Sequence, residues 1–113
     1  MEPENISNRA MEAYLSADET FASPASFWEI AVKVSVGKLT LKKGWSQRFH
    51  SMLQEEGIQM IPFQVEDYEI LSALPLHNKD PFDRMLIAQA KSRSLALVSN
   101  DSLMENYGIP VIW

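Results

Sequence analysis

Three acidic residues stand at points of the sequence where their side chains could meet in one site. Glu29 and Asp83 fall in the first turns of two predicted helices, and Asp101 follows an apolar run that predicts a buried strand. If the three carboxylates converge, their mutual repulsion must be relieved by proton uptake or by a cation. Carboxylate oxygens are hard ligands, which Mg²⁺ and Mn²⁺ prefer. Such a site suits phosphodiester hydrolysis, because the metal generates hydroxide and stabilises the charge that develops on phosphate.

Each carboxylate also has a purely structural interpretation, which the local pattern favours when the residue is taken alone. The sequence Ser26–Phe27–Trp28–Glu29 has the form of a capping box, in which the Glu side chain accepts from a backbone N–H. Asp80 is a good N-cap, so Asp83 can complete a similar pair and favour the helix dipole. Asp101 ends an Asn-Asp pair, which is typical of turns. With these roles alone, the three acids would contribute to stability and not to chemistry.

A local run of positive charge lies in an acidic chain. The 113 residues include 10 Lys and Arg against 15 Asp and Glu, a formal charge of −5. This balance argues against a protein that holds nucleic acid by bulk positive charge. Lys33, Lys38, Lys42 and Lys43 nevertheless follow one another closely. They form either a solvated face or a docking strip for a phosphate backbone beside an acidic site.

Other classes of chemistry lack their residues in this sequence. The chain has no Cys, which excludes disulfides, zinc–thiolate sites and thiol nucleophiles. It has neither a Gly-x-Ser-x-Gly elbow nor a Gly-rich phosphate loop, and His50 and His77 are far apart. No apolar run approaches the roughly 18 residues that a membrane helix needs. The first residues are polar and acidic, unlike a secretory signal. We therefore expect a cytoplasmic protein without membrane contact.

Apolar periodicity predicts helices alternating with short strands. The alternation is typical of a three-layer α/β fold with a mainly parallel sheet. In such folds ligands gather beyond the carboxyl ends of the strands, where Asn100 and Asp101 would lie. Asp80 as N-cap and Pro81 as first helical residue make one helix start especially clear. The predicted helices are 6–17, 26–36, 45–56, 65–74, 81–93 and 103–106, and the predicted strands are 20–22, 58–63, 95–98 and 110–112.

The segment 80–90, Asp-Pro-Phe-Asp-Arg-Met-Leu-Ile-Ala-Gln-Ala, followed by Leu-Val-Ser-Asn-Asp at 97–101, resembles the PIN-domain family. Within that family it is similar to the VapC-like toxin ribonucleases of type II toxin–antitoxin pairs. Segments 23–33, 37–39 and 107–112 also resemble this subfamily, so the resemblance covers nearly the whole chain in order. It implies one α/β/α domain over residues 1–113, with a parallel sheet.

The resemblance also implies an activity and the residues that carry it. Glu29, Asp83 and Asp101 match the acidic cluster that binds Mg²⁺ or Mn²⁺ in these ribonucleases. Ser99 matches the hydroxyl residue before the last acid, and candidate substrate contacts are Ser99, Lys33 and Arg84. The implied partners are an RNA substrate, a cognate antitoxin protein and a second copy of the chain in a homodimer.

One family feature has no match in this sequence. These proteins normally open with a strand that ends in an Asp, and Met1 falls where the chain would already be past that strand. We therefore expect a domain truncated at its N-terminus, whose sheet lacks its central strand and leaves inner edges unpaired. An alternative interpretation is then a catalytically incompetent interaction module that binds antitoxin or dimerises. A third is a non-nuclease α/β domain whose carboxylates are only helix caps.

Overall fold

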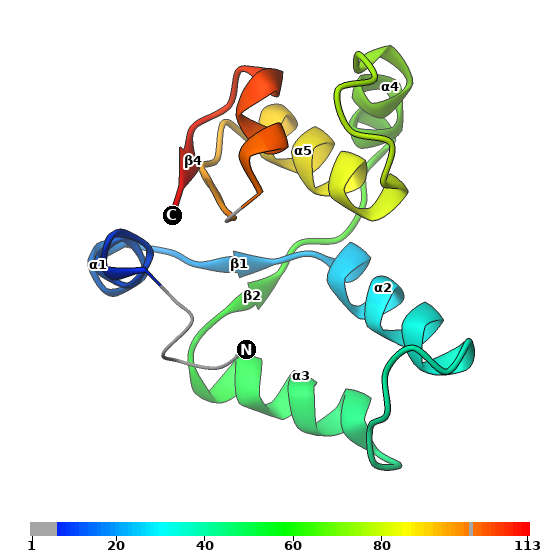
Figure 1. Cartoon of the computed structure of the whole chain (residues 1–113). Helices are drawn as coiled ribbons and strands as arrows, with labels where there is room; N and C mark the ends of the chain where they lie inside the picture. Colours follow the sequence, from blue (N-terminus) through cyan, green and yellow to red (C-terminus); the bar gives the residue numbers. More distant parts are fainter. Residues whose placement is uncertain (1–6, 100) are drawn as a thin grey trace. The chain divides into compact units, whose positions relative to one another are not determined.

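The chain is a mixed α/β protein (Figure 1), and its computed structural model describes residues 7–99 and 101–113. The described part contains five α-helices, one 3-10 helix and four short strands, in the order that the sequence predicts. The chain divides into two compact units. One is Glu19–Pro62, and the other joins Met1–Asp18 with Phe63–Trp113. The prediction of one domain over 1–113 stays a prediction.

The unit Glu19–Pro62 is a pair of helices joined to a two-stranded parallel sheet. Its elements are β1 (Phe21–Ala22), α2 (Pro24–Ser35), α3 (Trp45–Glu55) and β2 (Gln59–Met60). The two strands pair in parallel, with Phe21 opposite Gln59. Three aromatic rings pack α2 against α3, with ring centroids 6.1–6.3 Å apart. They belong to Phe27, Trp45 and Phe49.

Helix α2 begins earlier than the sequence pattern predicts. We expected it to start at Ser26, but Pro24 is its first residue. Ser23 is the N-cap, and its Oγ accepts a hydrogen bond from the Ala25 N–H at 3.0 Å. Proline suits this first position because its fixed φ is helical and its missing N–H would have no helical partner. The shift of two residues moves Glu29 from the first turn of the helix to its sixth position.

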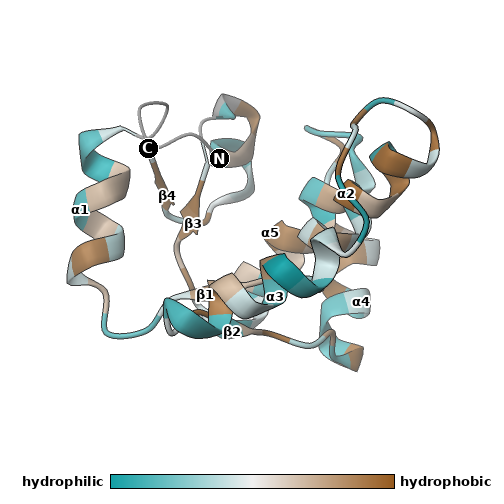
Figure 2. Cartoon of the chain, turned by 90° about the horizontal axis from the view of Figure 1, so that it is seen from below, coloured by the Kyte–Doolittle hydropathy of each residue, from teal (hydrophilic) through white to brown (hydrophobic). Residues whose placement is uncertain are grey.

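The second unit contains the larger hydrophobic core. Its elements are α1 (Asn8–Ser16), α4 (Val65–Ala73), α5 (Pro81–Arg93), β3 (Leu97–Val98), the 3-10 helix η2 (Ser102–Tyr107) and β4 (Val111–Ile112). Strands β3 and β4 pair in parallel, and both are hydrophobic along their length (Figure 2). The buried core residues are Leu74, Ile87, Met104 and Tyr107, with five partly buried apolar side chains packed against them.

A buried ion pair joins α4 to α5. The Asp67 carboxylate, with no exposed surface, accepts hydrogen bonds from Arg93 Nη1 at 2.9 Å, Ser92 Oγ at 2.7 Å and the Gln64 N–H at 2.8 Å. Burial alone would raise the pKa of Asp67. The hydrogen bonds from Arg93, Ser92 and Gln64, together with the charge of Arg93, outweigh that effect and hold the pKa below its ordinary value. The last turn of α5 is therefore fixed to the first turn of α4.

The predicted α/β class and parallel strand pairing are confirmed. Helix 81–93 is confirmed at both ends, while the strands are shorter than predicted, at two residues each. The absence of a central strand stays a prediction. No helix among the described residues is long and apolar enough to cross a membrane.

Candidate active site

Asp83 lies at the third position of α5, where the chain enters the helix from a structured loop. Its N–H donates to Asp80 Oδ1 at 3.2 Å, alongside the Phe82 N–H at 2.8 Å, so Asp80 is the N-cap as predicted. A reciprocal capping box would direct the Asp80 N–H to the Asp83 carboxylate. That N–H donates instead to Asn78 Oδ1 at 2.8 Å. The predicted capping-box pair of Asp80 and Asp83 is therefore wrong, although Asp83 does lie in the first turn, where it favours the helix dipole.

Asn78 is the residue that holds the Asp83 carboxylate. The Asn78 Nδ2 donates to Asp83 Oδ2 at 3.1 Å. Asn78 is itself buried, and its N–H donates to the Tyr107 hydroxyl at 2.8 Å. That hydroxyl in turn donates to the Asn78 carbonyl at 3.3 Å, and the His77 ring packs edge-on against the Tyr107 ring at 5.2 Å. The loop before α5 is thus fastened to the end of η2.

Asp101 caps the 3-10 helix η2 just after β3. Its Oδ1 accepts from the Leu103 N–H at 3.0 Å, and its own N–H donates to Ser99 Oγ at 3.1 Å. The hydroxyl of Ser99 therefore supports the backbone that carries Asp101. Asn100, which we expected beside it, lies outside the described residues.

Arg84 binds backbone carbonyls at the end of α4. Its Nη2 donates to the carbonyls of Leu71 at 3.3 Å and Leu74 at 3.2 Å, and its Nη1 donates to that of Pro75 at 2.9 Å. These carbonyls belong to the last turn of a helix and the residues after it, where a cationic donor satisfies orphan acceptors and the helix dipole. Arg84 thus has a structural role, and its contact with substrate stays a prediction.

Glu29 lies at the sixth position of α2, one and a half turns in, because the helix begins at Pro24. The capping box with Ser26 is therefore wrong. Its carboxylate forms an ion pair with Lys33 Nζ at 3.0 Å, across one helical turn. The Glu29 side chain is 26% exposed and that of Lys33 is 51% exposed. A cation at the predicted site would have to replace Lys33 as the partner of this carboxylate.

Among the residues that the structure describes, no group of side chains forms a metal centre. No three His, Asp or Glu side chains there lie close enough to share an ion. Asp83 and Asp101 belong to the second unit and Glu29 to the first. Their carboxylate oxygens are the donors that Mg²⁺ and Mn²⁺ prefer. Convergence of the three remains a prediction.

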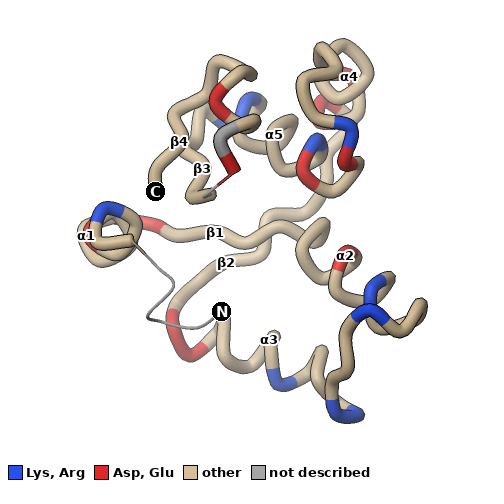
Figure 3. The backbone as a smooth tube through the Cα atoms, viewed as in Figure 1, with Lys and Arg blue, Asp and Glu red and all other residues tan. Residues whose placement is uncertain are grey.

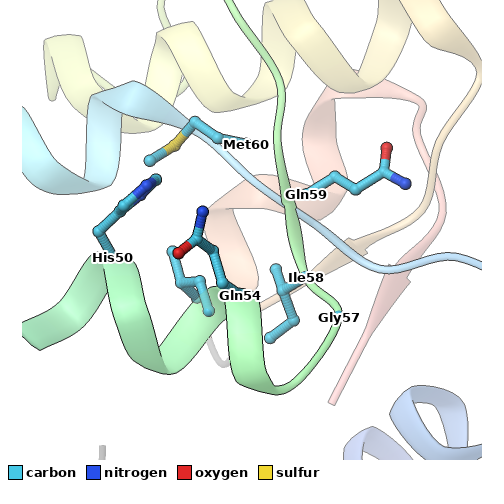
Figure 4. Close-up of a pocket in the computed structure, with 7 residues that line it drawn as sticks. His50, Gln54, Gly57, Ile58, Gln59 and Met60 are labelled. Atoms are coloured by element: carbon cyan, nitrogen blue, oxygen red, sulfur yellow. The ribbon is translucent and has the colours of Figure 1, made fainter.

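A hollow of about 450 Å³ lies between α3 and β2, away from all predicted site residues along the chain. His50, Leu53 and Gln54 line it from α3, and Ile58, Gln59 and Met60 from the β2 segment. Figure 4 shows the side chains of His50 and Met60 pointing toward each other, while Gln59 points away. Its walls hold no carboxylate, so it lacks the ligands of the predicted metal site.

Comparison with known proteins agrees with the motif at the start of α5. The model of the PIN-domain family matches residues 1–110 of the 113. The chain therefore belongs to the PIN-domain family, whose members are generally nucleases and typically use divalent metal ions. A comparison with curated proteins gave no match.

Proposed function

We propose that this protein is a metal-dependent endoribonuclease, the toxin of a VapC-like toxin–antitoxin pair. The observation that carries the proposal is the PIN-domain match over residues 1–110. The segment that resembles VapC-like toxins most specifically, Asp80 to Ala90, forms the start and body of α5, with Asp83 in its first turn. A cytoplasmic location, a cognate antitoxin and a homodimer belong to the same proposal.

In this proposal Glu29, Asp83 and Asp101 hold one or two Mg²⁺ or Mn²⁺ ions. When bound, the metal supplies hydroxide and stabilises charge on the phosphate. The protein's own contribution is to present carboxylates in fixed positions. Asp83 is held by Asn78, and Asp101 is held by bonds to Ser99 and Leu103. Fixed ligands cost little reorganisation when the cation binds.

The α2–α3 region offers a surface for the RNA backbone. Between Ile30 and Gln54 the chain carries five cationic residues and no acidic one, and they line the end of α2, the connecting loop and the start of α3 (Figure 3). The loop is held in shape, because the Arg48 guanidinium donates to the Lys42 carbonyl at 3.2 Å and to the Lys43 carbonyl at 3.1 Å. A preformed basic loop lowers the entropy lost when phosphates bind. The five residues are Lys33, Lys38, Lys42, Lys43 and Arg48.

Asp83→Asn tests the catalytic part of the proposal. The substitution keeps the size of the side chain and removes the charge that the cation needs. We expect Mg²⁺- or Mn²⁺-dependent cleavage of a labelled single-stranded RNA of mixed sequence to fall by at least ~100-fold. Glu66→Gln, at an exposed position in the first turn of α4, is the matched control and should cleave normally. Undiminished cleavage by Asp83→Asn would refute the role.

A second candidate is a catalytically incompetent interaction module. Titration of the chain with Mn²⁺ by calorimetry separates the two. The nuclease predicts saturable binding that Asp83→Asn abolishes. The module predicts no binding, together with retained association with a protein partner.

A further inference from the structure

We propose that Asn78 is a positioning residue for Asp83, which sets the direction of the Asp83 carboxylate toward a bound cation. The inference rests on the proposed function and assigns a role to a residue outside the three acids. Asn78 lies two residues before the Asp-Pro-Phe-Asp-Arg segment, and the sequence pattern assigns it no role at Asp83. The structure nevertheless makes it the partner of Asp83 Oδ2.

The orientation of the Asn78 amide follows from its neighbours. A backbone N–H can only donate, so the amide atom facing the Asp80 N–H at 2.8 Å must be the oxygen. The nitrogen then faces Asp83 Oδ2 at 3.1 Å, where a carboxylate can only accept. The two contacts agree with a single orientation of the amide, and reversing it would break both. The Asn78 amide thus accepts from the N–H of the N-cap residue Asp80 through its oxygen and donates to Asp83 through its nitrogen.

The backbone of Asn78 is fixed as firmly as its side chain. The residue is 7% exposed, and its N–H and C=O both bond to the Tyr107 hydroxyl, at 2.8 and 3.3 Å. Arg84 Nη1 also donates to the Asn78 carbonyl at 3.4 Å. Rotating the side chain away would leave buried polar groups without partners, which is unfavourable. Asp83 is therefore held by a rigid donor.

The chemistry of the donor suits a carboxylate that must also bind a cation. Asp67, a carboxylate with a structural role, is fixed in a different way. It is fully buried and bonds to the Arg93 guanidinium. A guanidinium orients a carboxylate but also neutralises it and repels an approaching Mg²⁺ or Mn²⁺ ion. An amide N–H orients the carboxylate without adding a positive charge. Asn78 thus orients the carboxylate without neutralising its negative charge.

The first experiment measures the contact without any metal. Asn78→Asp, Asp83→Asn and the double variant Asn78→Asp/Asp83→Asn form a double-mutant cycle in thermal unfolding at pH 7, with EDTA present. Asn78→Asp places two carboxylates face to face, and we expect its melting temperature to fall by about 4–8 °C. The double variant exchanges donor and acceptor while the acceptor for the Asp80 N–H remains. It should recover most of that loss; a loss equal to the sum of the two single variants overturns the proposal.

The second experiment measures the effect on the ion. We expect Asn78→Ala to bind Mn²⁺ about 10-fold more weakly in calorimetry, the usual range for removing a residue that orients a ligand. Arg93→Met is the control: it breaks the buried ion pair with Asp67 but leaves the Asn78–Asp83 bond and the Tyr107 contacts, so it should lose stability and keep Mn²⁺ affinity. Equal Mn²⁺ affinity of Asn78→Ala and the unmodified chain overturns the positioning role. If the cycle shows coupling but the unmodified chain binds no Mn²⁺, the proposed function is what falls.

Discussion

The ion pair between Asp67 and Arg93 gives the sharpest prediction about stability. Arg93→Met removes the guanidinium and leaves an aliphatic chain of similar reach. The Asp67 carboxylate has no exposed surface, so it would stay buried and still accept from the Ser92 hydroxyl and the Gln64 N–H. Removing one partner of a buried ion pair costs about 3–5 kcal/mol. Because the Arg93 side chain is 18% exposed and water can enter as it leaves, we expect the lower end, about 3 kcal/mol.

The dependence of this cost on pH follows from the pKa of Asp67. In the intact chain that pKa lies below its unfolded value of about 3.9, so the pair stabilises the fold above pH ~4. This stabilisation is lost as the pH falls through the folded pKa. In Arg93→Met the buried carboxylate has lost its counter-charge, and burial then raises its pKa above the unfolded value. The variant therefore gains stability relative to the intact chain as the pH falls from 7 to 4.

Urea unfolding followed by circular dichroism at 222 nm measures both effects. We expect the free-energy difference between Arg93→Met and the intact chain to be about 3 kcal/mol at pH 7 and clearly smaller at pH 4. Lys79→Met is the matched control, since it removes one charge from an exposed position beside the same helix; it should change stability by less than about 0.5 kcal/mol. A cost below about 1 kcal/mol at pH 7, or one independent of pH, contradicts a buried ionised pair.

Three further predictions concern the helix ends and the basic loop. Asp80→Ala should destabilise the fold by about 1–2 kcal/mol in thermal unfolding, because two N–H groups of α5 lose their acceptor. Arg84→Met should lower the melting temperature of the free protein through loss of its bonds to the end of α4; unchanged stability with weaker RNA binding would instead assign Arg84 to the substrate. Lys42→Ala and Lys43→Ala should each reduce the slope of log K against log salt for single-stranded RNA by roughly 0.7, as measured by fluorescence anisotropy.

The features that the sequence predicts well are those decided by neighbouring residues. Helix α5 is confirmed from Pro81 to Arg93, because an Asp before a Pro and the apolar spacing are both local signals. The start of α2 is mispredicted, because both Ser23 and Ser26 can cap a helix and only the position of Pro24 distinguishes them. That error also misassigned Glu29 to a capping box.

The features that the sequence does not predict depend on contacts between distant residues. Asn78 meets Tyr107 across 29 positions, and Asp67 meets Arg93 across 26. No local pattern marks these partners. Asn78 has a weak signal in hindsight: a polar residue two positions before an N-cap can accept from the N–H of the cap residue. Its second bond, to Asp83, cannot be predicted from the sequence and is seen only in the structure.

The ion pair of Glu29 with Lys33 is compatible with a metal role for Glu29. Pairs spaced four residues apart on an exposed helix surface contribute only about 0.3–0.5 kcal/mol. The binding of a divalent ion by several carboxylates exceeds this many times over, so Mg²⁺ or Mn²⁺ can displace the Lys33 ammonium at small cost. Asp67 is the opposite case, because its pair is buried and breaking it costs several kcal/mol. A displaced Lys33 ammonium would then contact the RNA backbone together with Lys38, Lys42 and Lys43, which follow the end of α2. Cation binding and contact with the RNA backbone would thus favour the same rearrangement.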